Sequence, residues 1–135
     1  MERPQITMTG PVLDAADVAE LARFYERFLG WNLVELAQPS DGPPGGWWAM
    51  VRPSEGWGKV EIQYEEHFVR PVYPGAGGAQ GMQIHLDYQV DDVPEAVAWA
   101  TECGAIEAEW QPPTRDLTRL RVMLDPAGHP FCLWS

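Results

Sequence analysis

One order of predicted elements occurs twice along this chain, and this repeat constrains the fold more than any other feature. A strand, a helix and three further strands are predicted between about residues 4 and 69, and the same order follows between residues 82 and 135. The intervening stretch RPVYPGAGGAQG, residues 70–81, is rich in Pro and Gly, as linkers are. We therefore predict a single α+β domain over residues 1–135, built from two tandem βαβββ modules.

The two helices carry the clearest local signals of the repeat. In DVAELARFYERFLGW the apolar residues fall at helical spacing, with Asp17 as the expected N-cap and Gly30 as the stop. In DDVPEAVAWATECGA, Asp92 and Gly104 take the same places. One helix per module covers one face of that module's mixed sheet. We therefore expect the helices on the outer side and a concave cup formed by the two remaining sheet faces.

Composition narrows the kind of partner. The 135 residues include 20 acidic and 9 basic side chains, which gives a formal net charge of −11. This balance argues against nucleic acid and against anionic membranes, because both are held through Lys and Arg. A long apolar run and an export leader are both lacking, and two cysteines do not make a disulfide framework, so we expect a cytoplasmic protein. A neutral or cationic small molecule would not be repelled.

Alternation along the strands predicts which side chains face the cup. Successive residues of a strand point to opposite faces, and the apolar sets are expected to lie beneath the helices. The side chains on the other face then share the cup. They are Glu61, Gln63 and Glu65 in KVEIQYEE, Gln83, His85, Asp87 and Gln89 in MQIHLDYQV, and Cys132 and Trp134 in PFCLW.

The chain has seven tryptophans, and we expect that some of them lie at the surface rather than in the core. Trp47 and Trp48 are adjacent, so one is expected to pack inward and the other to meet the cup or solvent. Trp57 lies in a Gly-flanked turn, whereas Trp99 and Trp110 are expected to pack. Exposed aromatic rings near carboxylates suit a flat or cationic ligand. They also suit an oligomer interface, so we expect a small-molecule ligand and a homodimer.

One pair of strands has a register that charge complementarity predicts. AIEAEW and TRLRV each carry two charged residues in alternate positions. If Glu109 lies opposite Arg119, then antiparallel pairing places Glu107 opposite Arg121, and both pairs stand on one face. We expect this register because each pair then joins opposite charges.

Four stretches of the chain resemble the vicinal oxygen chelate superfamily, which includes glyoxalase I, extradiol dioxygenases and bleomycin-resistance proteins. They are VLDAADVAELARFYERFLGW, VEIQYEE, HLDYQVDDVPEAVAWATECGA and LDPAGHPFCLW, and they run from about residue 12 to 134. The Asp-Pro-x-Gly hairpin and the helix end Phe-Tyr-x-x-x-Leu-Gly are characteristic. The resemblance implies the duplicated βαβββ fold and a ligand bound in the cup, and it is closest for glyoxalase-like domains of bacteria.

The resemblance also implies where a metal would be held. Metal-using members take one ligand from each of four strands, and the corresponding positions here are Gly10, Gln63, His85 and Cys132. Only His85 keeps a standard ligand of those members. We therefore expect no cofactor and no tightly held metal. If an ion is bound, we expect a weakly held divalent metal, with zinc favoured because Cys and His suit it, and with His85, Gln63 and Cys132 as its ligands.

Three interpretations of function stay open. The first is a glyoxalase/bleomycin-resistance-like protein that binds a cationic or aromatic small molecule. The second is an enzyme, either a metal-dependent lyase, isomerase or dioxygenase, or a metal-free one that uses His85 as its acid or base. The third is a dimer with no ligand. His67 and His129 are expected in exposed turns outside the cup. The predicted ligand-binding residues are Gln63, His85, Asp87, Cys132, Trp47, Trp48 and Glu61.

Overall fold

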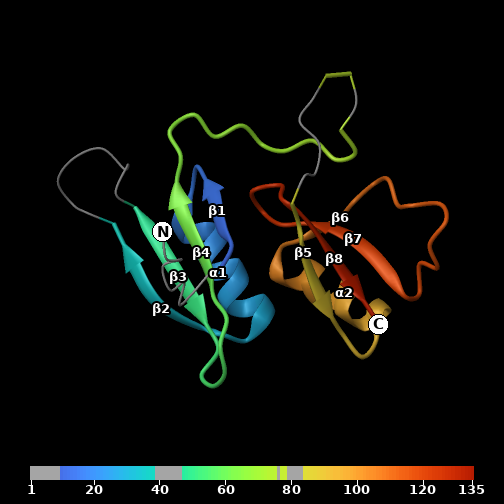
Figure 1. Cartoon of the computed structure of the whole chain (residues 1–135), viewed down its shortest axis with the longest axis horizontal. Helices are drawn as coiled ribbons and strands as arrows, with labels where there is room; N and C mark the ends of the chain where they lie inside the picture. Colours follow the sequence, from blue (N-terminus) through green and yellow to red (C-terminus); the bar gives the residue numbers. More distant parts are fainter. Residues whose placement is uncertain (1–9, 39–46, 76, 79–83) are drawn as a thin grey trace, which may run out of the picture.

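The computed structural model of the chain contains the predicted element order twice (Figure 1). It describes residues 10–38, 47–75, 77–78 and 84–135. The predicted cup residue Gln83 and parts of the first strand and of the linker lie outside these ranges. The module boundaries near residues 4 and 82 therefore stay predictions. The first module comprises β1 (Val12–Ala15), α1 (Val18–Leu29), β2 (Asn32–Ala37), β3 (Trp48–Arg52) and β4 (Val60–Tyr64), and the second comprises β5 (Leu86–Gln89), α2 (Val93–Cys103), β6 (Ile106–Glu107), β7 (Leu120–Leu124) and β8 (Pro130–Trp134).

Both helices begin and end where the sequence predicts. The Asp17 side chain accepts a hydrogen bond from the Glu20 amide at 2.9 Å, and Asp92 accepts one from the Glu95 amide at 2.8 Å. Gly30 and Gly104 follow the last turns with φ of 63° and 117°, a backbone conformation that glycine adopts without strain. Within the described residues, neither helix has the length and apolarity needed to cross a bilayer.

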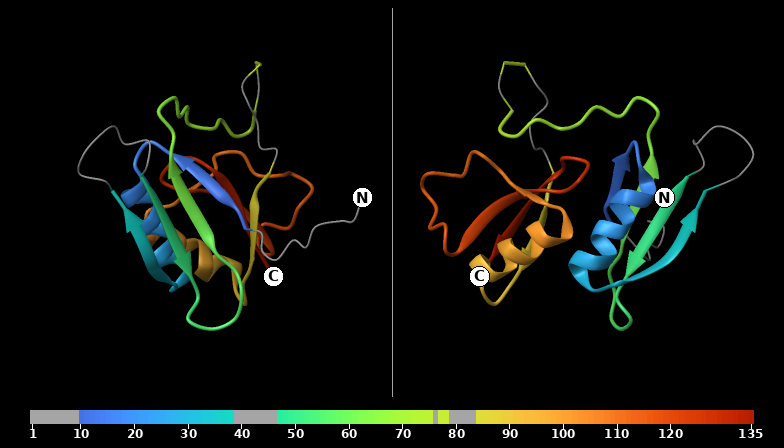
Figure 2. Two further views of the ribbon diagram at one scale, coloured as in Figure 1. Left: turned by 60° about the vertical axis from the view of Figure 1, so that its left-hand side comes forward. Right: turned by 180° about the vertical axis from the view of Figure 1, so that it is seen from behind.

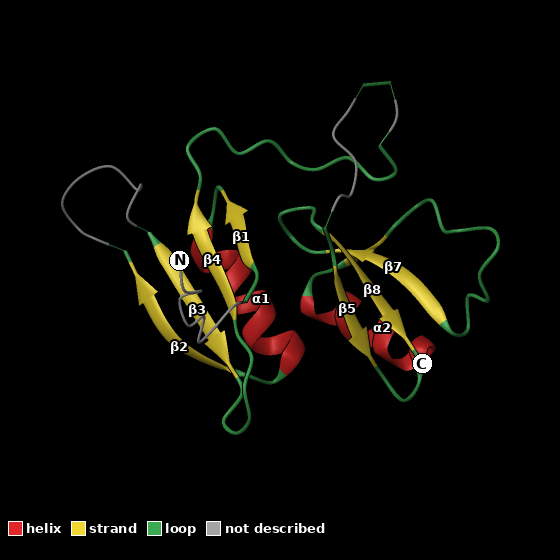
Figure 3. Cartoon of the chain, in the orientation of Figure 1, coloured by secondary structure: helices red, strands yellow, loops and turns green. Residues whose placement is uncertain are grey.

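Each module folds into its own four-stranded mixed sheet. The strand order is β1-β4-β3-β2 in the first sheet and β5-β8-β7-β6 in the second. The pairs β1–β4 and β5–β8 are parallel, and the other pairs are antiparallel. Seen from behind, α1 and α2 lie between the viewer and the sheets (Figure 2). Figure 3 shows the opposite side, where both sheets turn their helix-free faces to the viewer. These are the two faces that the sequence predicts to line the cup.

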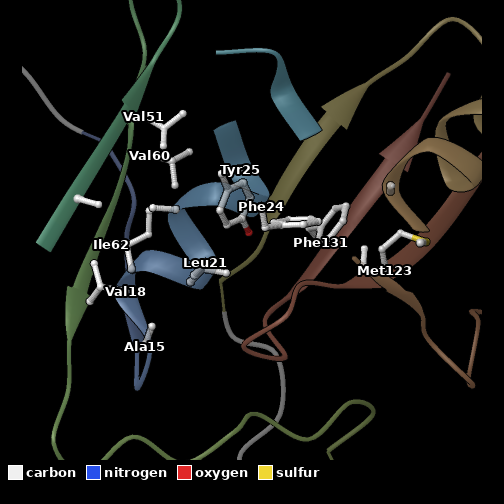
Figure 4. Close-up of a cluster of buried hydrophobic side chains, with 14 of the residues drawn as sticks. Ala15, Val18, Leu21, Phe24, Tyr25, Val51, Val60, Ile62, Met123 and Phe131 are labelled. Atoms are coloured by element: carbon white, nitrogen blue, oxygen red, sulfur yellow. The ribbon is translucent and has the colours of Figure 1, made fainter. Parts of the chain in front are cut away.

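One hydrophobic core joins the two modules. It is built from the buried faces of α1, β3 and β4 together with β8 and β7 of the second module. The rings of Phe24 and Phe28 stack at 5.5 Å, and Phe28 lies 5.4 Å from Phe131 of β8. Figure 4 shows Phe24 of α1 and Phe131 next to each other between the modules. Because α1 packs against strands of both modules, burial of its apolar face stabilises the whole domain.

A buried polar network also crosses between the modules, and it corrects the expectation for His129. The Tyr25 hydroxyl of α1 donates to Asp125 Oδ2 at 2.8 Å, and Asp125 is 0% exposed. His129 Nδ1 lies 2.9 Å from the same oxygen, and its side chain is only 19% exposed. His129 is therefore not an exposed turn residue. Its backbone amide and its ring nitrogen both contact the Asp125 carboxylate at the start of the Asp-Pro-Ala-Gly hairpin. A buried carboxylate needs such hydrogen-bonding partners.

The predicted register between AIEAEW and TRLRV is wrong. In the structure Glu107 lies opposite Met123, two residues beyond the expected partner Arg121. The Arg121 guanidinium nevertheless forms an ion pair with Glu107, across the diagonal. No ion pair joins Glu109 to Arg119 in the described ranges. A long arginine side chain reaches a diagonal neighbour, so charge complementarity alone did not fix the register.

Candidate functional site

Three chemically active side chains meet on the helix-free face of the second sheet. Asp87 of β5 and Cys132 of β8 are direct partners across the parallel pair, so their side chains share that face. His85 precedes Asp87 by two residues and lies on the same side. Its Nε2 atom is 3.0 Å from Asp87 Oδ1. One ligand atom from each of the three residues lies within 4.8 Å of the other two, and we call this group the His85–Asp87–Cys132 cluster.

The environment of Cys132 keeps its sulfur protonated. The residue is 6% exposed, whereas His85 and Asp87 are exposed. Burial, the negative charge of Asp87 and a hydrogen bond to that carboxylate raise the pKa of the Cys132 thiol to about 11. The thiolate is the form of cysteine that attacks electrophiles. At neutral pH Cys132 is therefore a neutral donor to Asp87 rather than an activated nucleophile.

Aromatic side chains lie beside the cluster. Tyr73, from the segment between the modules, packs against the small apolar group around Cys132. Its ring meets Trp110 edge to face at 5.8 Å, and Trp110 is 43% exposed. Burial raises the pKa of the Tyr73 hydroxyl, and the neighbouring Cys132 adds to this shift. We call Tyr73, Trp110 and Trp134 the aromatic patch, because Trp134 follows Cys132 on the same face of β8.

Sequence reasoning missed two of the three residues of this patch. The sequence places Tyr73 in the predicted linker and predicts that Trp110 packs, so only Trp134 is expected in the cup. The available signal was an aromatic residue placed between two prolines in a segment otherwise poor in large side chains. Trp99 was also expected to pack, but it lies at the surface of α2 with its indole N–H donating to the Phe28 carbonyl.

On the first sheet the predicted residues Gln63 and Glu61 each bond to a neighbouring side chain. The Gln63 amide donates to Asp14 Oδ1 at 2.8 Å, across the β1–β4 pair. Glu61 accepts from the Lys59 ammonium at 2.7 Å in a half-buried ion pair. The structure therefore brings His85, Asp87 and Cys132 together, while the side chains of Gln63 and Glu61 have partners on their own sheet.

The adjacent tryptophans point to opposite faces. Trp47 packs against the core and lies 6.2 Å from the Tyr64 ring. Trp48 is the direct partner of Gln63 across β3 and β4, so its half-buried side chain shares the cup face. Trp57 is 91% exposed in the turn before β4. Of the pair, it is therefore Trp48 that lies where a ligand in the cup would be.

The four positions at which the resemblance implies metal ligands do not fit such a site. Gly10 has no side chain, and a Cβ added there would lie 2.9 Å from Lys59 Cγ. The stem of Lys59 thus fills the space that the first ligand would need, and it brings a positive charge. The Gln63 amide is bonded to Asp14. The two ligand positions on the first sheet are therefore lost. Of the four positions, only His85 and Cys132, on the second sheet, keep donor atoms that are not bonded to a residue of the first sheet.

The fold occurs in proteins of related but varied activity. Over 98% of both chains it matches TnmS3, an antibiotic binding protein from Streptomyces sp. CB03234, with 18% identity and a TM-score of 0.58. It matches the fosfomycin resistance protein FosX from Mesorhizobium loti with 15% identity and a TM-score of 0.64, over 95% of this chain and 90% of that one.

A mutant FosX from Listeria monocytogenes, complexed with Mn(II) and 1S,2S-dihydroxypropylphosphonic acid, matches with 13% identity and a TM-score of 0.64, over 95% of this chain and 88% of that one. At such identities these likenesses show the fold alone. No curated protein matches the chain. The family described as glyoxalase-like domain matches residues 11–134, which is nearly the whole sequence. Together with the duplicated βαβββ modules and their two open sheets, this match shows that the chain belongs to the glyoxalase-like domain family of the vicinal oxygen chelate superfamily.

Proposed function

We propose that this protein binds a small aromatic cation in its cup, as a bleomycin-resistance-like binder without a tightly held catalytic metal. The observation that carries the proposal is the position of the aromatic patch beside the His85–Asp87–Cys132 cluster and its Asp87 carboxylate. Tyr73 packs next to Cys132 and meets the Trp110 ring edge to face, and Asp87 is the direct partner of Cys132 across β5 and β8. Within the described ranges Asp87 pairs with His85 and with no Lys or Arg.

The physical argument combines stacking with charge. An aromatic ring gains about 0.5–1.5 kcal/mol from each well-placed aromatic neighbour beyond the burial of its area. A ligand cation gains from Asp87 and from the face of a tryptophan. An anionic ligand would instead meet the carboxylates of Asp14 and Asp87 on the cup faces of the two sheets. The residues proposed to contact the ligand are Gln63, His85, Asp87, Cys132, Trp48 and Glu61, together with Tyr73 and Trp110; Trp47 supports the cup from the core side.

Calorimetric titration with a matched panel tests this proposal. The panel carries one aromatic ring system with an amine, a neutral or a carboxylate substituent, and we expect the amine to bind most tightly. Trp110→Ala should weaken binding of amine and neutral ligands alike by about 0.5–1.5 kcal/mol. Asp87→Asn should reduce only the preference for the amine, because it removes charge and keeps shape.

The control is Trp99→Phe, since Trp99 lies on α2, on the other side of the second sheet. It should leave every affinity unchanged. Equal affinity for amine and carboxylate ligands, or an equal loss in Trp99→Phe and Trp110→Ala, would contradict the proposal.

A second candidate function is an enzyme, and one observation favours it. Asp87 lies 3.0 Å from Nε2 of His85, a distance at which a carboxylate orients an imidazole for acid–base work. The other ring nitrogen is then left for a substrate. Recovery of the bound ligand separates the candidates, because a binder returns it chemically unchanged after prolonged incubation, whereas an enzyme that uses His85 converts it and loses this activity in His85→Ala.

The proposal also covers the oligomeric state and the cellular location of the protein. Exposed apolar side chains such as Trp57, Val69 and Ile84 favour a homodimer, because a soluble monomer gains nothing from exposing them. The reduced state of both cysteines is in keeping with the cytoplasm.

A further inference from the structure

The His85–Asp87–Cys132 cluster, which the proposed ligand also contacts, brings three potential metal-binding atoms close together on the second sheet. We propose that His85, Asp87 and Cys132 bind one zinc ion within the second module alone. Two of these residues occupy positions at which the family places ligands, but Asp87 does not. The site would therefore lie on the neighbouring strands β5 and β8, instead of bridging four strands of both modules.

The backbone places the three donors without help from the first module. Asp87 and Cys132 face each other in the parallel β5–β8 pair, and His85 lies two residues before Asp87 on the same face. Their ligand atoms all lie within 4.8 Å of one another, and His85 Nε2 is 3.0 Å from Asp87 Oδ1. Ligand atoms around one tetrahedral zinc, with bonds of about 2.0–2.3 Å, lie roughly 3.3–3.6 Å apart. Small side-chain rotations therefore suffice to close the site.

The chemistry of the donors selects the metal. Imidazole nitrogen, carboxylate oxygen and thiolate sulfur together suit zinc, whereas Mg²⁺, Ca²⁺ and Mn²⁺ prefer oxygen ligands. The charge also fits, because Asp87 pairs with no lysine or arginine among the described residues. On the first sheet, by contrast, the Lys59 ammonium already neutralises Glu61. Asp87 thus keeps a negative charge that no lysine or arginine of the described residues neutralises.

Gln63 has no place in this site. Its amide nitrogen donates to Asp14, and this hydrogen bond holds the whole Gln63 amide, including its oxygen, on the first sheet. Three protein ligands leave the fourth position of a tetrahedral ion open to water or to an incoming ligand. Because the His85 and Asp87 side chains are 35% and 56% exposed, the ion would exchange readily with solvent. We therefore expect reversible rather than permanent zinc binding.

Zinc alone is the probe for the first test. The full-length protein is freed of metal with a chelator, moved to chelator-free buffer near neutral pH and titrated with zinc in a calorimeter. We expect one zinc per chain. Asp87→Asn and His85→Ala should each lower the zinc affinity by more than the roughly 10–100-fold that loss of an outer-shell partner of a ligand costs. Gln63→Ala should leave the zinc affinity unchanged.

Cobalt provides the second test, because a thiolate bound to Co²⁺ gives a charge-transfer absorption band. The band should be present in the wild type and in Cys103→Ser, and absent in Cys132→Ser. Cys103 is the matched control, since it is the other free cysteine and lies half-buried on α2. Cys132 is buried, so folding of Cys132→Ser is checked by circular dichroism. If that variant does not fold, the zinc affinity of Asp87→Asn, a change at an exposed residue, tests the site instead.

Two results would overturn the zinc site: no zinc uptake by the wild type, or a Gln63→Ala variant that loses as much affinity as Asp87→Asn. The zinc titration is carried out without the aromatic ligand, so its outcome is separate from the test of the proposed function. A protein that binds aromatic cations but no zinc would refute the metal site alone, and one that binds zinc but no aromatic cation would refute the proposed function alone.

Discussion

Cys132 illustrates how neighbouring residues decide the chemistry of a single side chain. Its strand position puts the sulfur on the cup face, next to the Asp87 carboxylate. Tyr73 and Val122 pack against it. The thiol remains protonated because burial raises its pKa, and the negative charge of Asp87 raises it further. The same sulfur would become a ligand only when a cation compensates that charge.

Alkylation of the two cysteines should depend differently on pH. We expect Cys132 in the metal-free native protein to react with iodoacetamide more slowly than Cys103 near neutral pH, and its rate to rise until the pH reaches about 11. Because its pKa is raised from 9.0, the protonated thiol stabilises the fold fully below pH 9, and this contribution is lost as the pH rises to about 11. Peptide mass spectrometry measures both rates. Equal labelling of the two cysteines at neutral pH would contradict this prediction.

Among the elements, β6 differs most from its prediction, and a side chain explains why. The predicted strand covered AIEAEW, but β6 ends at Glu107. Beyond β6, the side chain of Gln111 forms hydrogen bonds with the backbone of β7. Its Oε1 accepts from the Val122 amide at 2.9 Å, while its Nε2 donates to the Val122 carbonyl at 2.8 Å and to the Ala108 carbonyl at 2.9 Å. The side-chain amide thus replaces a stretch of backbone ladder, which strand periodicity does not predict.

Gln111→Ala should therefore destabilise the domain. The change leaves the amide of the buried Val122 without its partner, whereas the Val122 carbonyl still accepts from the Ala108 amide. An unsatisfied buried group costs about 1–3 kcal/mol. Urea unfolding followed by circular dichroism measures the loss as a lower midpoint with an unchanged slope. The control Gln89→Ala, at an exposed position of β5, should change the free energy of unfolding by less than about 0.5 kcal/mol. Similar midpoints for the two variants would show that Gln111 does not stabilise β7.

At the scale of the whole molecule, two modules share one core yet leave apolar surface uncovered. Phe24 and Phe28 of α1 pack on Phe131, and Tyr25 bonds to Asp125, so the helix-side contact between the modules is extensive and specific. On other surfaces Trp57 and Ile84 remain 91% and 88% exposed. Apolar side chains of this size are stabilised when a second copy covers them.

We expect light scattering at micromolar concentration to give a mass twice the 15.1 kDa of one chain. Dilution should shift the mass towards that of one chain, since association depends on protein concentration. Trp57→Asp should favour the monomer if this turn lies in the interface, with circular dichroism as the check on folding. A mass of one chain across the whole concentration range would refute the homodimer.

Local and periodic signals in the sequence determined the helix ends, the strand faces and the duplicated order of elements. Asp17 and Gly30 act within a few residues, and alternation placed His85 and Asp87 on one face, because both signals depend only on backbone geometry. Three decisive contacts instead join residues far apart in the chain. Only the tertiary structure brought Lys59 into the space beside Gly10, Tyr73 onto Cys132 and Asp125 onto Tyr25. Such contacts depend on how modules pack, and no local pattern records them.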